Sequence, residues 1–237
     1  MANVVYDIEG KLPRLTKIMT SKPLSVEGPV REELGFWHGK NENSSGAHSR
    51  LSRYWDHIRF GSWSASGTPW SAAFISYVLG QADRNFKGAA SHYKYIENVI
   101  EGRSPGWEAF SIPKNIGKLK IQPGDILVKA RSGDKYSTHG DLVASVKGMK
   151  AALVGGNVGN TAKQVGTLSL YPNGTIREGG NYQVLLKKNP VSTVQYGWSR
   201  VLAYGGFAAA FGLTGVLAFM VAKRKGLIGS WQPPKGE

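Results

Sequence analysis

The 237-residue sequence contains no cysteine. This absence excludes disulfide bonds, thiolate nucleophiles and cysteine-ligated metals. The five histidines form no HExxH motif or other zinc-binding spacing. The glycine-rich stretch GGNVGNTAKQ lacks the residue order of a phosphate-binding loop. We therefore expect no cofactor and no metal, and any nucleophile must be an oxygen or a nitrogen.

Acidic residues are scarce, because 16 Asp and Glu stand against 30 Lys and Arg and give a formal net charge of +14. Such an excess predicts an anionic partner: peptidoglycan or another anionic polymer, acidic lipid, or nucleic acid. The basic residues are scattered along the chain without a groove-reading motif, so we do not expect nucleic-acid binding.

Long apolar runs are also few. Charged residues interrupt the first 30 positions, so no signal peptide is predicted. The exception is residues 201–222, which carry no charge and are long enough to cross a bilayer. We predict one transmembrane helix at 201–223, with the basic residues after it on the cytoplasmic side of a host or viral membrane. The alternative is a buried core helix. Small residues at four-residue spacing in this run would also permit a homo-oligomer.

Residues 31–190 are predicted to form one α+β domain. Helical periodicity favours helices within 29–39, 48–60, 69–82 and 88–103. Short β-rich runs follow, separated by Gly, Asn and Pro, at 125–130, 139–146, 151–156, 166–171 and 182–188. Helices followed by strands are typical of an α+β fold with an antiparallel sheet. Around this domain we expect an N-terminal arm (1–30), a linker (191–200) and a basic, polar tail (224–237).

Four motifs occur in an informative order: PWSAAFIS at a helix start, QPGDILV at the opening of the sheet, HGDLVASV, and ALVGGNVGN. This order resembles the papain-like fold of NlpC-type and CHAP-type cell-wall amidases and endopeptidases. More narrowly, PWSAAFISYVLGQAD with SHYKYI is similar to an uncharacterised family of bacterial and phage proteins related to those enzymes. The similarity covers roughly residues 31–175.

The resemblance implies three catalytic positions. In enzymes of that fold a helix-start cysteine is the nucleophile, a histidine at a strand start is the base, and a polar residue on the next strand orients the histidine. The matching positions are Ser71, His139 and Asn157. Serine stands in place of cysteine, and a hydroxyl is far less acidic than a thiol. It therefore needs a strong base and a preorganised oxyanion site.

The residues themselves also favour a cluster. Thr68 suits an N-cap and Pro69 a first helical position, which places Ser71 in the first turn, where free N–H groups favour an anion. The stretch VASVKGMKAALV predicts a hairpin that brings His139 and Asn157 close together, although a one-residue shift would change the face they share. We expect Ser71 and His139 to meet in one solvent-accessible crevice.

Three more residues are candidates for the cleft. His92 matches an element that lines the cleft in the resembling family. Asp141, two residues after His139 on the same strand, is an alternative orienting residue. Trp70 belongs to a set of tryptophans that could line a glycan groove or pack in the core. Each site residue also has a purely structural interpretation: a helix-start serine, a structural histidine, or an asparagine that serves a turn.

These features predict a membrane-anchored peptidoglycan hydrolase that cleaves an amide bond, with Ser71 as nucleophile and His139 as base. The missing signal peptide suits a phage virion protein acting in cell-wall penetration or genome delivery, with the lipid bilayer and other virion proteins as partners. The alternative is a catalytically inactive papain-fold protein with a structural or wall-binding role in the virion membrane. The lack of cysteine favours this alternative.

Overall fold

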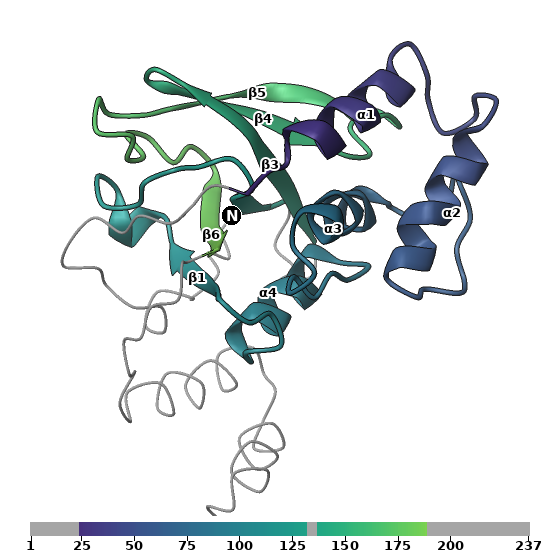
Figure 1. Ribbon diagram of the computed structural model, residues 1–237, viewed down its shortest axis with the longest axis horizontal. Helices are drawn as coiled ribbons and strands as arrows, with labels where there is room; N and C mark the ends of the chain where they lie inside the picture. Colours follow the sequence, from purple (N-terminus) through teal and green to yellow (C-terminus); the bar gives the residue numbers. More distant parts are fainter. Residues whose placement is uncertain (1–23, 132–136, 189–237) are drawn as a thin grey trace, which may run out of the picture. The chain divides into compact units, whose positions relative to one another are not determined.

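An antiparallel sheet organises the chain (Figure 1). The computed structural model describes residues 24–131 and 137–188, and within these ranges six strands pair in the order β1-β6-β2-β3-β4-β5. Their bounds are β1 Trp107–Ser111, β2 Ile126–Ala130, β3 Thr138–Lys147, β4 Lys150–Gly155, β5 Lys163–Ser169 and β6 Tyr182–Lys188. The last of these strands in the sequence, β6, therefore lies between β1 and β2.

Four α-helices precede the sheet in the described part of the sequence. They are α1 Glu27–Trp37, α2 Ala47–His57, α3 Ser71–Ala82 and α4 His92–Ile100, and a short 3-10 helix, η1 Pro113–Asn115, follows β1. The central helix α3 packs against α2, β3 and β4, while α4 packs against β1 and β3. The predicted order of helices first and strands afterwards is confirmed. Strand β1 was not among the predicted runs.

Local sequence explains these helices. In α2, Leu51, Tyr54 and Trp55 recur at helical spacing and are fully buried, whereas most of the other residues of α2 are polar. Helix α4 begins with an N-cap, because the side chain of Ser91 accepts a hydrogen bond from the backbone N–H of Lys94. Tertiary packing of these apolar faces supplies most of the stability of such short helices.

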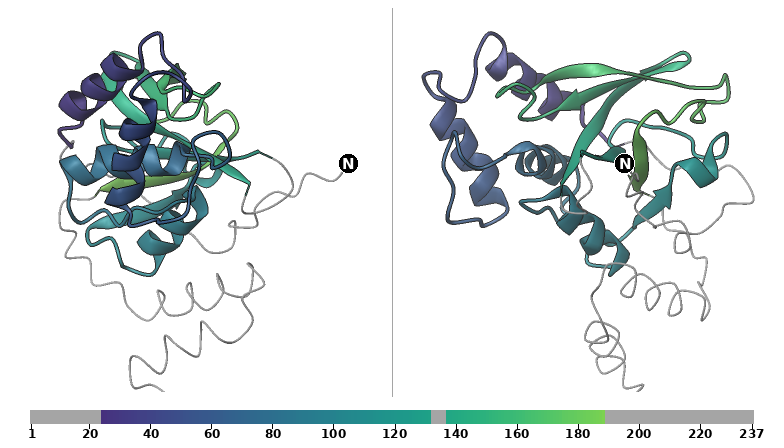
Figure 2. Two further views of the ribbon diagram at one scale, coloured as in Figure 1. Left: turned by 90° about the vertical axis from the view of Figure 1, so that its right-hand side faces the viewer. Right: turned by 180° about the vertical axis from the view of Figure 1, so that it is seen from behind.

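The sheet is curved, with β3, β4 and β5 forming a ribbon that extends away from β1, β2 and β6 (Figures 1 and 2), and α1 packs against α3 and β3. Pairing of Leu127 with Leu185 and of Val143 with Leu153 brings these side chains into one buried cluster. The full cluster is Phe110, Ile112, Leu119, Ile121, Leu127, Val143, Ala151, Leu153, Leu168, Leu170, Ile176 and Leu185. This core fixes β2, β3 and β6 against one another.

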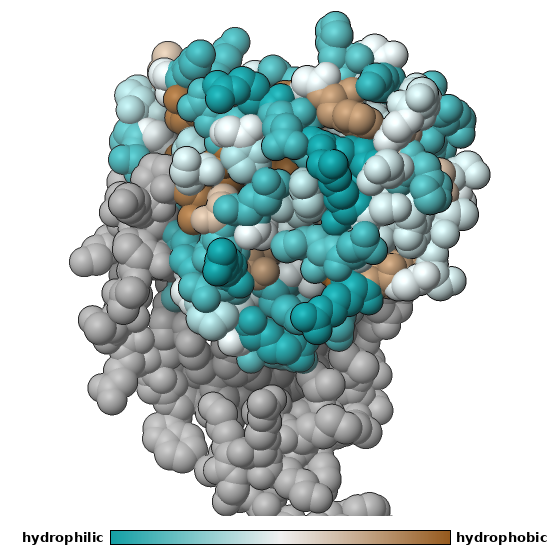
Figure 3. Space-filling view, turned by 45° about the vertical axis from the view of Figure 1, so that its right-hand side comes forward, coloured by the Kyte–Doolittle hydropathy of each residue, from teal (hydrophilic) through white to brown (hydrophobic). Residues whose placement is uncertain are grey.

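Few large apolar side chains are exposed on the described part of the molecule. The face in Figure 3 is mostly hydrophilic, and its apolar residues form small separate patches. Among the described residues, the large apolar side chains that stay exposed are Phe60, Met149 and Tyr171. Single exposed apolar residues of this kind are normal for a folded domain.

The predicted fold class needs a correction. The α+β class and the antiparallel sheet are observed, but within 24–131 and 137–188 no helix is both long enough and apolar enough to cross a membrane. The structure therefore shows an α+β domain over residues 24–131 and 137–188, and the membrane-spanning part of the predicted fold class is not observed in these ranges. Residues 201–223, where that helix was predicted, lie outside the described residues, as do positions 1–23 of the arm, the linker and the tail.

Candidate functional site

Ser71 is the first residue of α3. The N-cap is Trp70, and the predicted Thr68 cap is wrong, because its side chain instead accepts a hydrogen bond from the N–H of Ser64 at 3.0 Å. No hydrogen bond from the N–H groups of Ser71, Ala72 or Ala73 is found among the described residues. The hydroxyl of Ser71 is therefore accompanied by free N–H donors and by the positive end of the helix dipole.

Ser71 lies against a histidine and an aspartate from β3. Its Oγ is 3.3 Å from Nδ1 of His139, and Nε2 of the same ring is 3.1 Å from Oδ1 of Asp141. Because a carboxylate only accepts hydrogen bonds, Nε2 carries the ring proton and Nδ1 presents a lone pair to the hydroxyl. These three side chains are arranged as nucleophile, base and orienting acid.

Asp141 is held ionised by its neighbours. Tyr182 donates to its Oδ2 at 2.5 Å, and the Lys129 ammonium lies 3.3 Å from the same oxygen. Burial alone would raise the pKa of Asp141, but the hydrogen bond and charge of His139, the Tyr182 hydroxyl and Lys129 outweigh it and lower the pKa to about 2. The carboxylate therefore stays negative at neutral pH and accepts the hydrogen bond from His139.

His92 is a second imidazole at the same hydroxyl, with Nε2 3.1 Å from Ser71 Oγ. The Gly140 N–H donates to this nitrogen at 3.3 Å, so Nε2 is unprotonated and Nδ1 donates to the Tyr95 hydroxyl. Burial, together with the charges of His139 and Arg131, lowers the pKa of His92 to about 3, although Asp141 acts in the opposite direction. His92 is therefore neutral, and the hydroxyl of Ser71 lies between two imidazole nitrogens that can accept its proton.

A glycine permits this second contact. Gly140 lies between His139 and Asp141 on β3, so it faces the opposite side of the sheet, where α4 packs. A Cβ at this position would lie 2.5 Å from the Tyr95 hydroxyl and 2.6 Å from Nδ1 of His92. Any larger residue would push α4 and its histidine away from Ser71.

Asn157 does not orient the base, which corrects the prediction. A bulge at Ala144 changes the β3–β4 register by one residue, and β4 ends at Gly155. Asn157 follows in a left-handed conformation with φ of 55°, as is typical of a turn. Within the described residues no hydrogen bond joins it to His139, and Asp141 occupies the orienting position instead.

Trp70 packs in the core, which is the second of the two placements expected for it. It is fully buried, stacks on Trp37 with ring centroids 4.8 Å apart, and donates from Nε1 to Glu42 at 3.2 Å. It cannot act as a surface for sugars in this conformation. Its packing instead anchors the start of α3 and so positions Ser71.

The site is less open than the predicted crevice. Ser71 is 5% exposed and His139 is 4% exposed. The exposed Arg131 reaches over the base, and its Nη2 lies 3.0 Å from Nδ1 of His139. Ser71 and His139 are therefore almost closed to solvent in this conformation.

Four residues of this arrangement were not predicted: Lys129, Tyr182, Tyr95 and Arg131. Lys129 pairs with His139 across β2–β3 and with Tyr182 across β2–β6, so all three share one face of the sheet. Tyr95 could have been found from its spacing of three residues from His92 on a helix. Tyr182 could not, because its position depends on β6 pairing with a strand more than 50 positions earlier in the sequence.

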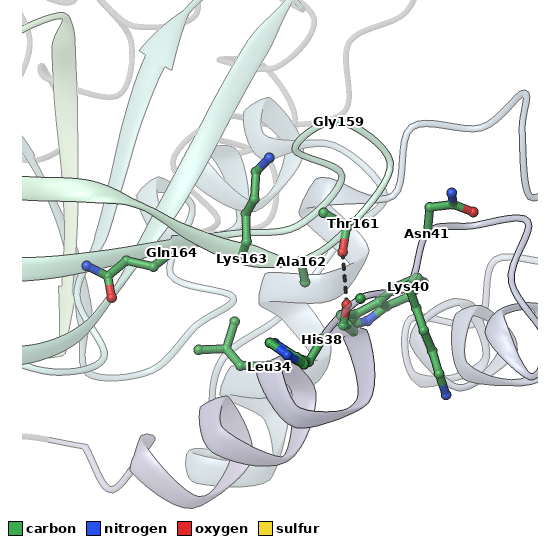
Figure 4. A pocket seen from close by; sticks show the side chains of 11 residues that line it. Leu34, His38, Lys40, Asn41, Gly159, Thr161, Ala162, Lys163 and Gln164 are labelled. Atoms are coloured by element: carbon green, nitrogen blue, oxygen red, sulfur yellow. Dashed lines mark hydrogen bonds between the residues drawn. The ribbon is translucent and has the colours of Figure 1, made fainter.

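A cavity separate from this site lies beside α1 (Figure 4). It has a volume of about 470 Å³ and is formed between the end of α1 and the start of β5. Thr161 donates to the carbonyl of Trp37 at its edge. Its lining residues are Leu34, Trp37, His38, Gly39, Lys40, Asn41, Gly159, Thr161, Ala162, Lys163 and Gln164, so neither Ser71 nor His139 lines it.

Comparison with known proteins gives one match. None of the curated proteins and none of the solved structures matches the chain. A family described as "Uncharacterized protein conserved in bacteria (DUF2272)" matches residues 32–203, which include the helices from α2 onward, the whole sheet and every residue of the site above. Because this match covers well over half of the sequence, the protein belongs to the DUF2272 family.

Proposed function

We propose that this protein is a serine hydrolase of papain-like type that cleaves amide bonds in the bacterial cell wall. The observation that carries the proposal is the alignment of Ser71 Oγ, His139 and Asp141 at 3.3 Å and 3.1 Å. Ser71 at the start of a helix and His139 at the start of a strand also fit the motif order of the papain-like enzymes. The excess of basic residues suits an anionic polymer such as peptidoglycan.

The reaction begins with the hydroxyl of Ser71. Its proton moves to Nδ1 of His139 while Oγ forms a bond to the carbonyl carbon and the C=O π electrons become an oxyanion. In this mechanism the N–H groups at the start of α3 bind that oxyanion. Collapse of the oxyanion breaks the C–N bond, and the proton on Nδ1 passes to the leaving amine.

Water completes the cycle. It attacks the acyl group on Ser71, and Nδ1 of His139 takes its proton. The second collapse breaks the bond to Oγ, which recovers the proton from Nδ1 as the carboxylic acid leaves. Asp141 holds the ring and stabilises the imidazolium in both halves of the cycle.

The test compares the wild-type protein with Ser71→Ala and His139→Ala on isolated cell walls, with release of free amino groups as the readout. We expect each variant to lose about a thousandfold or more in rate. Ser76→Ala is the matched control, because this buried serine of the same helix bonds only backbone atoms and is expected to change stability but not activity. Full activity of the Ser71 variant would exclude the mechanism.

Ser71→Cys gives an independent readout. The chain has no cysteine, so this variant carries a single thiol. A thiol beside His139 and a helix start should be alkylated by iodoacetamide faster than a free cysteine below pH 8. Loss of that rate advantage in Ser71→Cys, His139→Ala would show that the imidazole activates the group at position 71.

A second candidate function is binding without catalysis. The near burial of Ser71 and the contact of Arg131 with the base favour it, since both hinder attack on a substrate. In that case the protein would sediment with cell walls in a salt-sensitive manner, and Ser71→Ala would release no less wall material than the wild-type protein. The predicted association with a phage particle stays a prediction.

A further inference from the structure

Arg131 stands directly after β2 at the solvent side of the site. Its backbone N–H donates to the carbonyl of Ser137 at 2.8 Å, which fixes the backbone where the chain leaves β2. Its side chain is exposed, whereas His139 and Ser71 are almost buried. The guanidinium of Arg131 can therefore leave His139 and bind a ligand that arrives from solvent.

In the resting structure Arg131 competes with the nucleophile. Its Nη2 is 3.0 Å from Nδ1 of His139, and Ser71 Oγ is 3.3 Å from the same nitrogen. A guanidinium only donates hydrogen bonds, so it occupies the lone pair that must receive the serine proton. Its positive charge also opposes the formation of an imidazolium beside it. The base is thus hindered until Arg131 turns away.

We infer that Arg131 binds a carboxylate of the substrate next to the scissile bond, and that this pairing frees Nδ1 of His139. The inference rests on the proposed function. A carboxylate accepts two parallel hydrogen bonds from a guanidinium, which makes it a stronger partner than a single imidazole nitrogen. Arg131 forms no ion pair with any acidic side chain in the described ranges.

This pairing defines a class of substrate. An acyl group that carries a free carboxylate would bind Arg131 and activate the site in the same event. With a neutral acyl group of the same shape, Arg131 would stay hydrogen-bonded to Nδ1 of His139. The base would then remain hindered. The net charge of +14 would also draw anionic substrates to the protein.

The experiment uses two matched probes, the 4-nitrophenyl α-esters of N-acetylglutamate and N-acetylglutamine, which differ only in a carboxylate and a carboxamide. Rates of nitrophenolate release are measured with the full chain and corrected by the rate with Ser71→Ala. For the wild-type protein we expect kcat/KM about tenfold higher with the glutamate ester. In Arg131→Gln the ratio should fall to about one, because the glutamine ester reacts faster than before and KM for the glutamate ester rises.

Two variants control this experiment. Arg131→Lys keeps the charge without the planar pair of donors and should give an intermediate ratio. Arg84→Gln removes an exposed arginine just past the far end of α3 and should leave the wild-type ratio unchanged. If Arg131→Gln keeps that ratio while both esters still react at Ser71, the inference about Arg131 is wrong and the hydrolase stands. If neither ester reacts above the Ser71→Ala rate in any variant, the proposed function itself fails.

Discussion

Two buried polar clusters lie in the same domain, and they differ in what their groups can still do. The Glu33 cluster joins Glu33, Arg50, Tyr54 and Trp37. Arg50 pairs with Glu33 at 2.9 Å, Tyr54 donates to that carboxylate, and Trp37 donates to the Tyr54 hydroxyl at 2.8 Å. The Ser71 cluster joins Ser71, His92, His139 and Asp141. It has one ionised acid, two imidazoles and a hydroxyl between them.

The comparison shows why burial of ionisable groups does not by itself mark an active site. In the Glu33 cluster, Glu33 and Arg50 form a direct ion pair. The cluster therefore has no acceptor positioned to take up a proton. In the Ser71 cluster, the hydroxyl of Ser71 contacts a nitrogen of each imidazole. The carboxylate of Asp141 contacts His139 and not the hydroxyl. The first arrangement stabilises the packing of α1 on α2, whereas the second can transfer a proton.

The largest expected effect on stability is at Glu33. Glu33→Ala leaves Arg50 buried without its closest inner partner, so we expect a loss of about 3–5 kcal/mol in the free energy of unfolding. Chemical denaturation measures this loss. Activity per folded molecule should remain near that of the wild-type protein, since none of the Ser71 cluster contacts Glu33 in the described structure.

Glu32 provides the matched control. It pairs with the same Arg50 at 2.7 Å, but its side chain is 54% exposed, whereas that of Glu33 is fully buried. Glu32→Ala should cost less than about 1 kcal/mol. Equal losses in the free energy of unfolding would show that the buried Glu33 carboxylate contributes no more to stability than the exposed Glu32 carboxylate.

The next effect is on catalysis, at Asp141. Asp141→Asn removes the charge that holds His139 and stabilises its imidazolium, so we expect a loss of about a thousandfold in kcat. Asp125→Asn is the comparison, because Asp125 is equally buried but pairs with Lys187 at 2.9 Å outside the site. It should lower stability and leave kcat almost unchanged. A similar kcat for both variants would remove Asp141 from the mechanism.

A smaller effect concerns pH and His92. Its pKa in the folded protein is about 3, below the ordinary value of 6.5. Between these pH values His92 is protonated in the unfolded chain but not in the folded protein. Its contribution to stability is therefore complete above about pH 6.5 and is lost as pH falls toward 3, with a slope of up to about 1.4 kcal/mol per pH unit. Denaturation of wild-type and His92→Asn proteins between pH 7 and pH 4 measures the difference. Parallel curves would contradict a neutral, buried His92.

Much of the fold could be predicted because its signals are local. The helices at 27–37, 47–57, 71–82 and 92–100 follow apolar spacing, and the β3–β4 hairpin follows from its turn, where Gly148 adopts a positive φ of 57°. Strand β1 was not predicted because its sequence, WEAFS, is neither a continuous apolar run nor a strict alternation of apolar and polar residues. The order of strands depends on long-range pairing that no local pattern encodes.

The site was partly predictable for the same reason. Helix-start chemistry indicated Ser71, and the strand spacing of two placed Asp141 beside His139. The choice of Asn157 was wrong because β4 ends at Gly155 and Asn157 already adopts the left-handed backbone of a turn, so it does not continue the strand beside His139. The burial of Trp70 and the contact of Arg131 are tertiary features, so composition alone could not reveal them.

The position of β6 has a consequence for how the protein is made. This strand is the last in the described sequence, yet it fills the middle of the sheet and brings Tyr182 to Asp141. Residues 182–188 must therefore be synthesised before β6 can pair with both β1 and β2 and join them in one sheet. A chain that ends before β6 would keep Ser71, His92 and His139 but lack the strand that brings Tyr182 to Asp141, so the cluster can assemble only after residues 182–188 have been made.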